Sequence, residues 1–170
     1  MWQIAIIAAL LAGVTSGAEQ RMGESRKATL RDSAGKEVGQ VTLREDRGAI
    51  KIDVRVRGLT KGRHGIHLHE TGLCDPPGFA SAGPHYNPHG KQHGRRNPQG
   101  PHLGDLGNIS VGGKGWGNKT ITVRSEETLA GLKSFLGDKG RALIVHASPD
   151  DEKTDPSGNS GPRIACAAVQ

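Results

Sequence analysis

Aromatic residues are scarce in this chain, which has two tryptophans, two phenylalanines and one tyrosine among its 170 residues. Cysteine is scarce too, with only two residues, and no internal repeat or heptad pattern is visible. The absence of repeats argues against a solenoid or a coiled coil. The shortage of aromatics leaves no stacking platform for nucleic-acid bases.

Turn-forming residues are abundant instead, with 26 glycines and 9 prolines, which favours many turns between short strands. The length fits one domain. A net charge of +6 would suit an anionic partner, but the basic residues are scattered and only Lys91, Arg95 and Arg96 approach a cluster. Solubility explains this charge most simply. We therefore predict no specific nucleic-acid partner and leave open a weak association with anionic surfaces.

The start of the chain differs in composition from the rest. Ile4–Val14 is an apolar run too short to span a bilayer, and the small residues Ser16–Ala18 follow it. We predict a secretory signal peptide at 1–18 that is cleaved after Ala18, a polar extension at 19–26 and one domain at 27–170. The run lacks a preceding Lys or Arg, so an uncleaved anchor is the alternative. The expected location is periplasmic or secreted.

Export bears on the two cysteines, Cys74 and Cys166. An oxidising compartment favours a disulfide between them, and the alternative is a pair of buried thiols.

In the mature chain, apolar and polar residues alternate with a period of two. In the run Ile50–Arg57, apolar residues alternate with charged ones, which is typical of a strand with one wet face. One segment, Ser125–Leu136, has a helical apolar stripe that includes Leu129 and Phe135. The sequence therefore predicts an all-β fold. Its other expected strands are Lys27–Arg31, Val38–Leu43, Arg63–Glu70, Asn108–Val111, Lys119–Val123, Ala142–His146 and Arg163–Val169.

Two long segments without strand pattern, 71–104 and 147–162, are typical of functional loops. Strand alternation puts His67 and His69 on one face of the fourth strand, where they could clamp a metal ion. His64 falls on the apolar face and is expected to be a hydrogen-bonded structural residue. His89 is expected to be exposed.

Histidines and one aspartate form a set too large for a single ion. Imidazoles with one carboxylate suit zinc or copper(II), so two adjacent metals are the natural interpretation. The set consists of His67, His69, His85, His93, His102, Asp105 and His146.

The motifs around these residues resemble the copper/zinc superoxide dismutase family, in its exported bacterial form. They are Gly65–Glu70, Ser81–Pro88, His102–Leu106 and Gly158–Cys166, and the resemblance covers about 27–169. It implies an eight-stranded Greek-key barrel and the disproportionation of superoxide to oxygen and hydrogen peroxide.

The resemblance also implies the metal ligands. Copper would be held by His67, His69, His85 and His146, and zinc by His85, His93, His102 and Asp105. His85 would then bridge the two ions and carry a proton during the reaction. Zinc has no redox chemistry and would supply order.

Further roles follow from the same resemblance. Asp150 matches a carboxylate that hydrogen-bonds one histidine of each site, here His67 and His93. Arg163 matches an arginine that docks the anion beside copper, and its guanidinium is expected to be held by the carbonyl of Cys74. Lys153 is a weaker candidate for attracting the anion.

Some features depart from the family pattern. Cys74 follows His69 by only five residues, which indicates the bacterial branch and leaves a homodimer or a monomer open. Tyr86 stands where phenylalanine is commoner, and Pro162 precedes Arg163 and could turn it away. A protein that binds or buffers copper and zinc outside the cytoplasm without significant catalysis is the alternative function.

Overall fold

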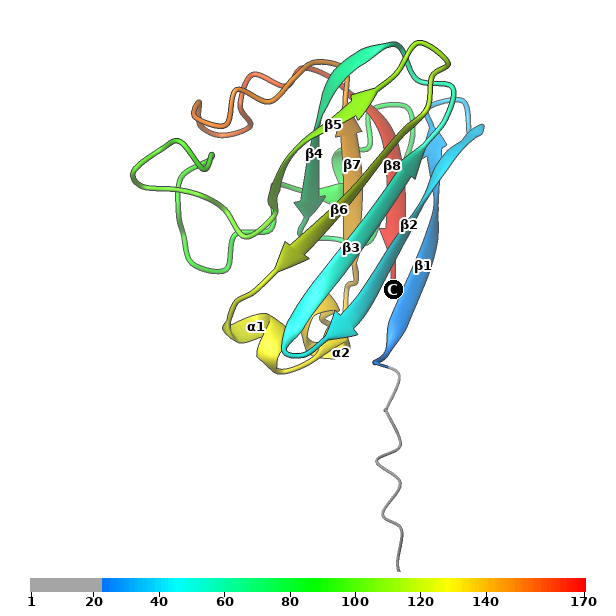
Figure 1. Ribbon diagram of the computed structural model, residues 1–170. Coiled ribbons are helices and arrows are strands. Elements are labelled where there is room, and N and C mark those ends of the chain that lie inside the picture. The colour runs from blue at the N-terminus through cyan, green and yellow to red at the C-terminus, as the bar shows by residue number, and fades with distance from the viewer. Residues whose placement is uncertain (1–22) are drawn as a thin grey trace, which may run out of the picture.

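The computed structural model describes residues 23–170, so the predicted signal peptide at 1–18 lies outside the described residues. Eight antiparallel strands curl into a nearly closed barrel in the order β5-β4-β7-β8-β1-β2-β3-β6 (Figure 1). The strands are β1 (Ser25–Asp32), β2 (Glu37–Asp46), β3 (Ala49–Val56), β4 (Gly62–His69), β5 (Asp105–Val111), β6 (Gly117–Val123), β7 (Arg141–His146) and β8 (Arg163–Val169). The pairing of β4 with β7 and of β3 with β6 gives Greek-key connections. The predicted eight-stranded all-β fold is confirmed.

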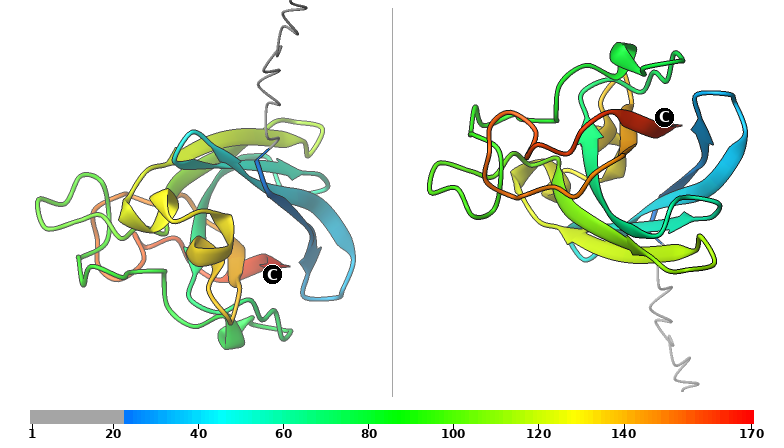
Figure 2. Two further views of the ribbon diagram at one scale, coloured as in Figure 1. Left: turned by 90° about the horizontal axis from the view of Figure 1, so that it is seen from below. Right: turned by 90° about the horizontal axis from the view of Figure 1, so that it is seen from above.

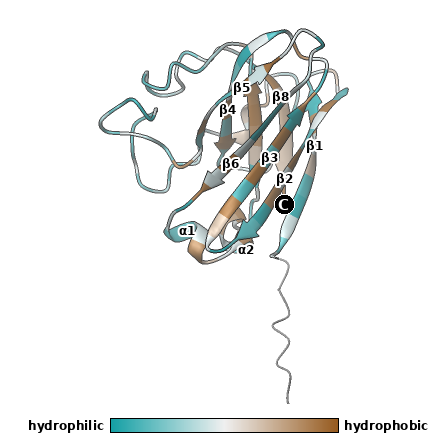
Figure 3. Ribbon diagram, in the orientation of Figure 1, coloured by the Kyte–Doolittle hydropathy of each residue, from teal (hydrophilic) through white to brown (hydrophobic). Residues whose placement is uncertain are grey.

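Strand alternation fills the interior of the barrel. On β3, Ile50, Ile52, Val54 and Val56 are buried, and Arg55 between them is exposed. Figure 3 shows the alternation of brown and teal along β3 and along its neighbour β2. Burial of the inward side chains supplies the hydrophobic stabilisation of the barrel.

The predicted single helical segment is two short helices, α1 (Glu126–Leu129) and α2 (Leu132–Leu136). Gly131 separates them with a φ of 92°, which interrupts the helical path. Phe135 is buried in the core, but Leu129 is 73% exposed, so its predicted place in the apolar stripe was wrong. Within residues 23–170, no helix has the length and apolarity needed to cross a membrane.

A disulfide joins Cys74 to Cys166 on β8, as predicted. It belongs to a small apolar cluster between the start of the first long loop and the outer face of β7 and β8, together with Phe79, Ala82, Ala142 and Ile144. The cysteines are 92 positions apart in the chain. On the chain-entropy model, a cross-link of this span stabilises the fold by about 4 to 5 kcal/mol.

The two long loops leave the barrel on the same side. Figure 2 shows segment 147–162, in orange, beside the later part of segment 71–104, in green. Both loops are hydrogen-bonded to the backbone of β4: Gly65 N–H donates to the Ser148 carbonyl, and Leu68 N–H donates to the Gly104 carbonyl, each at 2.9 Å. The loops thus pack against β4, whose residues from His64 to His69 are all buried.

Candidate metal centre

Seven buried side chains gather under the loops in two groups that share His85. The first group is His67, His69, His85 and His146, and the second is His85, His93, His102 and Asp105. Within each group, one candidate ligand atom from each residue lies within 4.8 Å of the others. The structure thus brings together all seven residues that the sequence singled out.

Several elements contribute to these groups. His67 and His69 lie on β4, Asp105 begins β5, and His146 ends β7. The first long loop brings His85 beside the end of β4, where it forms an isolated bridge with His69. His64 is buried, with its ring nitrogens 2.8 and 2.9 Å from carbonyl oxygens, as expected of a structural histidine.

Each of His67, His69 and His146 has one ring nitrogen paired and the other unpaired. The paired nitrogens donate from His67 Nε2 to Asp150 Oδ2 (3.0 Å), from His69 Nδ1 to the Gly83 carbonyl (2.8 Å) and from His146 Nδ1 to the Gly161 carbonyl (2.9 Å). Their second nitrogens are buried without a hydrogen-bond partner. An unpaired buried polar atom is costly, and a coordinated metal ion would remove that cost. The first group therefore fits a metal that prefers imidazole.

The second group converges on one carboxylate oxygen. Asp105 Oδ1 lies 2.9 Å from His85 Nδ1, 3.0 Å from His93 Nδ1 and 3.2 Å from His102 Nδ1. The other oxygen, Oδ2, accepts the backbone N–H of Gly94 and of His102, each at 2.9 Å, which fixes the carboxylate. Three imidazoles and one carboxylate oxygen are a ligand set typical of zinc.

The electrostatics of the first group favour metal binding. Burial lowers the pKa of His67 to about 3, of His69 to about 2 and of His146 to about 4. These imidazoles are therefore neutral near pH 7, which is the form that binds a metal ion.

The second group holds a proton until a metal displaces it. Burial works to lower the pKa of His93, but its hydrogen bonds to Asp105 and Asp150 outweigh burial and raise that pKa to about 9. Burial works to raise the pKa of Asp105, yet hydrogen bonds from His85, His93 and the Gly94 N–H hold it well below its usual range. Metal binding to this group would thus release a proton from His93.

Asp150 joins the two groups. Its Oδ2 accepts from His67 Nε2 at 3.0 Å, and its Oδ1 accepts from His93 Nε2 at 2.9 Å. The Asn108 side chain pairs with the backbone of Asp150, and Gly158 lies against the carboxylate. Sequence reasoning gave no role to Asn108 or Gly158. Only the position of Gly158 at the start of a family motif pointed to it.

Arg163 lies in an open hollow of about 790 Å³ that is also lined by His69, His85 and His146. Pro162 lines the same hollow and does not turn Arg163 away from it. Lys153 is exposed and is not among the lining residues. His89 is also exposed, as expected, and pairs with Glu127 at 3.3 Å.

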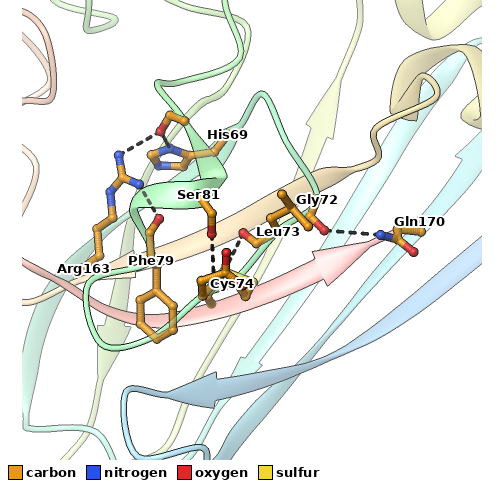
Figure 4. Close-up of a disulfide and its surroundings, with 11 residues drawn as sticks. His69, Gly72, Leu73, Cys74, Phe79, Ser81, Arg163 and Gln170 are labelled. Atoms are coloured by element: carbon orange, nitrogen blue, oxygen red, sulfur yellow. Dashed lines mark hydrogen bonds between the residues drawn. A yellow bond between two sulfur atoms is a disulfide. The ribbon is translucent and has the colours of Figure 1, made fainter.

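The expected bond from Arg163 to the Cys74 carbonyl was wrong. Nη1 donates to the Phe79 carbonyl at 2.7 Å and Nη2 donates to the Gly83 carbonyl at 2.8 Å (Figure 4). Cys74 is tied to Cys166, which lies three residues, or about 10 Å, along β8 from Arg163. The chain then turns through Phe79, whose φ is 55°, and the carbonyl of Phe79 takes the expected place of the cysteine carbonyl.

This fold and site define a two-metal protein built on a Greek-key barrel, and comparisons with known proteins agree. The family profile of copper/zinc superoxide dismutase (SODC) matches residues 37–169. Superoxide dismutase [Cu-Zn] 2 of Aquifex aeolicus is 39% identical over 149 residues, which cover 84% of this chain and 85% of that protein. Superoxide dismutase [Cu-Zn] of Caulobacter vibrioides is 36% identical over 86% of each chain.

A solved structure gives the same result. The crystal structure of a SOD-like protein from Bacillus subtilis superposes with a TM-score of 0.76 at 36% identity, over 85% of this chain and 97% of that one. The chain belongs to the copper/zinc superoxide dismutase family.

The contact at Gly158 gives a prediction. A Cβ at this position would lie 1.8 Å from Asp150 Oδ1 and 2.7 Å from His93 Nε2, and its φ of 66° disfavours any side chain. Gly158→Ala should therefore displace the Asp150 carboxylate and weaken metal retention about tenfold or more, measured by transfer of metal to a competing chelator. Gly113→Ala is the control, since a Cβ there meets nothing within 4 Å. Equal retention in both variants would contradict this role of Gly158.

Proposed function

We propose that this chain disproportionates superoxide to oxygen and hydrogen peroxide, with a metal pair divided between the two groups. Copper is assigned to His67, His69, His85 and His146. Zinc is assigned to His85, His93, His102 and Asp105. Binding or buffering of the two metals without significant catalysis is the competing function.

The unpaired ring nitrogens carry this proposal. Three buried nitrogens of the first group have no partner, while the opposite nitrogen of each ring is fixed by a carbonyl or a carboxylate. A set of neutral imidazoles suits copper, and the group borders an open hollow that a small anion can enter. The guanidinium of Arg163 in that hollow supports catalysis over storage, because storage needs no anion site.

Each residue then has a defined task. Copper held by the first group would supply one-electron exchange with superoxide. Arg163 provides a fixed positive charge for the anion, held in place by two carbonyls. His85 turns Nδ1 toward Asp105, which leaves Nε2 for the first group and makes Nε2 the atom that can take up a proton and pass it to the product.

The second group has an ordering task. The part of the chain from His85 to Asp105 contains little apolar side chain to bury, so ligand bonds from His85, His93 and His102 would hold it against the barrel. Displacement of the His93 proton is part of the cost of zinc binding, since burial and the Asp105 and Asp150 bonds leave the pKa of His93 at about 9. Zinc retention should therefore fall as pH falls.

We infer export to the periplasm or beyond from the apolar leader at 1–18 and from the disulfide. Superoxide is the substrate that the family name implies, while a weak attraction to anionic surfaces and the choice between monomer and homodimer stay predictions.

The inferred export predicts the mass of the mature protein. A chain recovered from the exported fraction should begin at Glu19 and have a mass two hydrogens below that of its dithiol form, because Cys74 and Cys166 are bonded. Intact-mass analysis with and without reduction measures both features. A full-length chain that still begins with Met1 would contradict cleavage.

The metal assignment predicts the effect of removing one ligand. Replacing His146 with Ala should abolish dismutation and copper binding but leave zinc bound, because His146 belongs only to the first group. Elemental analysis of the parent should give one copper and one zinc per chain. His89→Ala, at an exposed histidine outside both groups, is the matched control. Loss of both metals from the His146 variant would contradict the assignment, and a fully loaded but inactive parent would favour storage.

The charge of Arg163 predicts how activity depends on salt. Diffusional encounter with the substrate limits the rate of very fast enzymes. Superoxide dismutase is a general example of such diffusion control and of electrostatic steering. Added salt should lower kcat/KM of the unsubstituted protein. Arg163→Glu should lower kcat/KM far more than Arg163→Ala and should flatten or reverse the salt dependence, because salt would then screen a repulsion. Small and equal losses in both variants, with full copper occupancy, would show that Arg163 does not act on the anion.

A further inference from the structure

The barrel has one seam that backbone ladders do not close. β5 and β6 lie at the two ends of the strand order, and among residues 23–170 no ladder pairs one with the other. A backbone bond from Gly112 N–H to the Trp116 carbonyl joins them only near their connecting turn. Away from that turn, the carbonyl groups of β5 that face the seam need other donors.

A lysine on β6 supplies these donors. Lys119 has the same strand parity as Ile121 and Val123, which are buried, so it occupies an inward-facing position that is usually apolar. Its Nζ donates to the Leu106 carbonyl at 2.9 Å and to the Asn108 carbonyl at 2.8 Å. The ammonium group thus spans the seam and binds β5 at two points. Burial lowers the pKa of Lys119.

The strand that Lys119 binds, β5, carries one member of the second metal group and one residue that holds Asp150. Asp105 is its first residue, directly before Leu106. Asn108 lies two residues after Leu106 on the same strand, and its side chain binds the backbone of Asp150: Asp150 N–H donates to Asn108 Oδ1 at 2.7 Å, and Asn108 Nδ2 donates to the Asp150 carbonyl at 2.9 Å. β5 is held to β4 by a backbone ladder on one side and to β6 by Lys119 on the other, so both connections bear on the position of the Asp105 and Asp150 carboxylates.

We propose that Lys119 is a positioning residue for the metal centre: by binding β5 across the open seam, it fixes Asp105 and, through Asn108, fixes Asp150. Asp105 contacts three imidazoles of the second group, and Asp150 orients one imidazole of each group. Lys119 touches neither the metal ligands' ring nitrogens nor the hollow that holds Arg163. Its effect on the metals passes through the backbone of β5.

A purely stabilising lysine would behave differently. Loss of a charge-assisted bond to two carbonyls lowers the stability of any fold, and that alone leaves metal binding in the folded protein unchanged. Loss of a positioning residue changes the geometry of the ligand set. Groups that orient metal ligands directly affect affinity by about 10- to 100-fold. Since Lys119 acts one step further away, the expected effect lies at the lower end of this range.

The test compares Lys119→Met with Lys114→Met in the purified, metal-loaded protein. Methionine keeps the unbranched side chain and removes the ammonium group, and exposed Lys114 in the turn between β5 and β6 is the control for the loss of one positive charge. We expect zinc transfer to a competing chelator to become about tenfold easier in Lys119→Met and to stay unchanged in Lys114→Met. The copper(II) absorption and electron paramagnetic resonance spectra should also shift in Lys119→Met, because Asp150 orients His67.

A second variant keeps the test decisive. If Lys119→Met does not fold, Lys119→Gln, which retains an amide donor, should fold and show the same changes at smaller size. Unchanged zinc transfer and unchanged spectra in a folded Lys119 variant of reduced stability would overturn the proposal. The inference rests on the proposed function for its two metals, but the readouts use no superoxide. A parent that binds both metals and lacks activity would refute the dismutase proposal and leave this comparison intact.

Discussion

The buried carboxylate of Asp150 is the interaction on which the rest of the site depends. It accepts one hydrogen bond from His67 on the barrel and one from His93 in the first long loop, and it belongs to the second long loop itself. Three parts of the chain therefore meet at one side chain. A buried carboxylate is costly unless it is hydrogen-bonded. The two histidines, together with the Glu152 N–H at 2.6 Å from Oδ1, satisfy this carboxylate and so stabilise the packing of the loops on β4. The same bonds turn the opposite nitrogen of each ring toward its own metal group.

The barrel and the loops hold their ligands in different ways, because they differ in how much apolar side chain they can bury. The strands alternate apolar and polar residues and fill a dry interior, so β4, β5 and β7 give His67, His69, Asp105 and His146 fixed positions. The loops have many glycines and prolines and few large apolar side chains, so they are ordered mainly by hydrogen bonds to β4, by the disulfide and by the ligand groups. The ligands on the barrel strands are therefore held rigidly by the fold, whereas the order of the ligands on the loops depends on the bound metal.

Local rules predicted the parts of this structure that depend on alternation and residue chemistry. Strand parity correctly separated His67 and His69 from His64, and the eight strands followed from period-two patterns. Gathering distant ligands into two groups required the family resemblance, because spacing along a loop does not determine its path. Two errors lie in the backbone path: Gly131, with a φ of 92°, splits the predicted helix, and the loop presents the Phe79 and Gly83 carbonyls to Arg163 in place of the Cys74 carbonyl. Lys119 is a charged residue at a position of β6 where the alternation calls for an apolar one, and this departure was visible in the sequence.

A single carbonyl oxygen, that of Gly83, connects the anion site to the first metal group. It accepts from His69 Nδ1 and from Arg163 Nη2, each at 2.8 Å, so the imidazole and the guanidinium cannot move independently. The segment between Cys74 and Gly83 is held to β8 twice, by the disulfide and by Arg163. The disulfide and Arg163 thus hold the same segment, and the carbonyls that bind Arg163 are those of Phe79 and Gly83. This arrangement keeps a positive charge at a fixed distance from the imidazoles, and preorganisation of this kind avoids the cost of rearranging charges during each encounter with an anion.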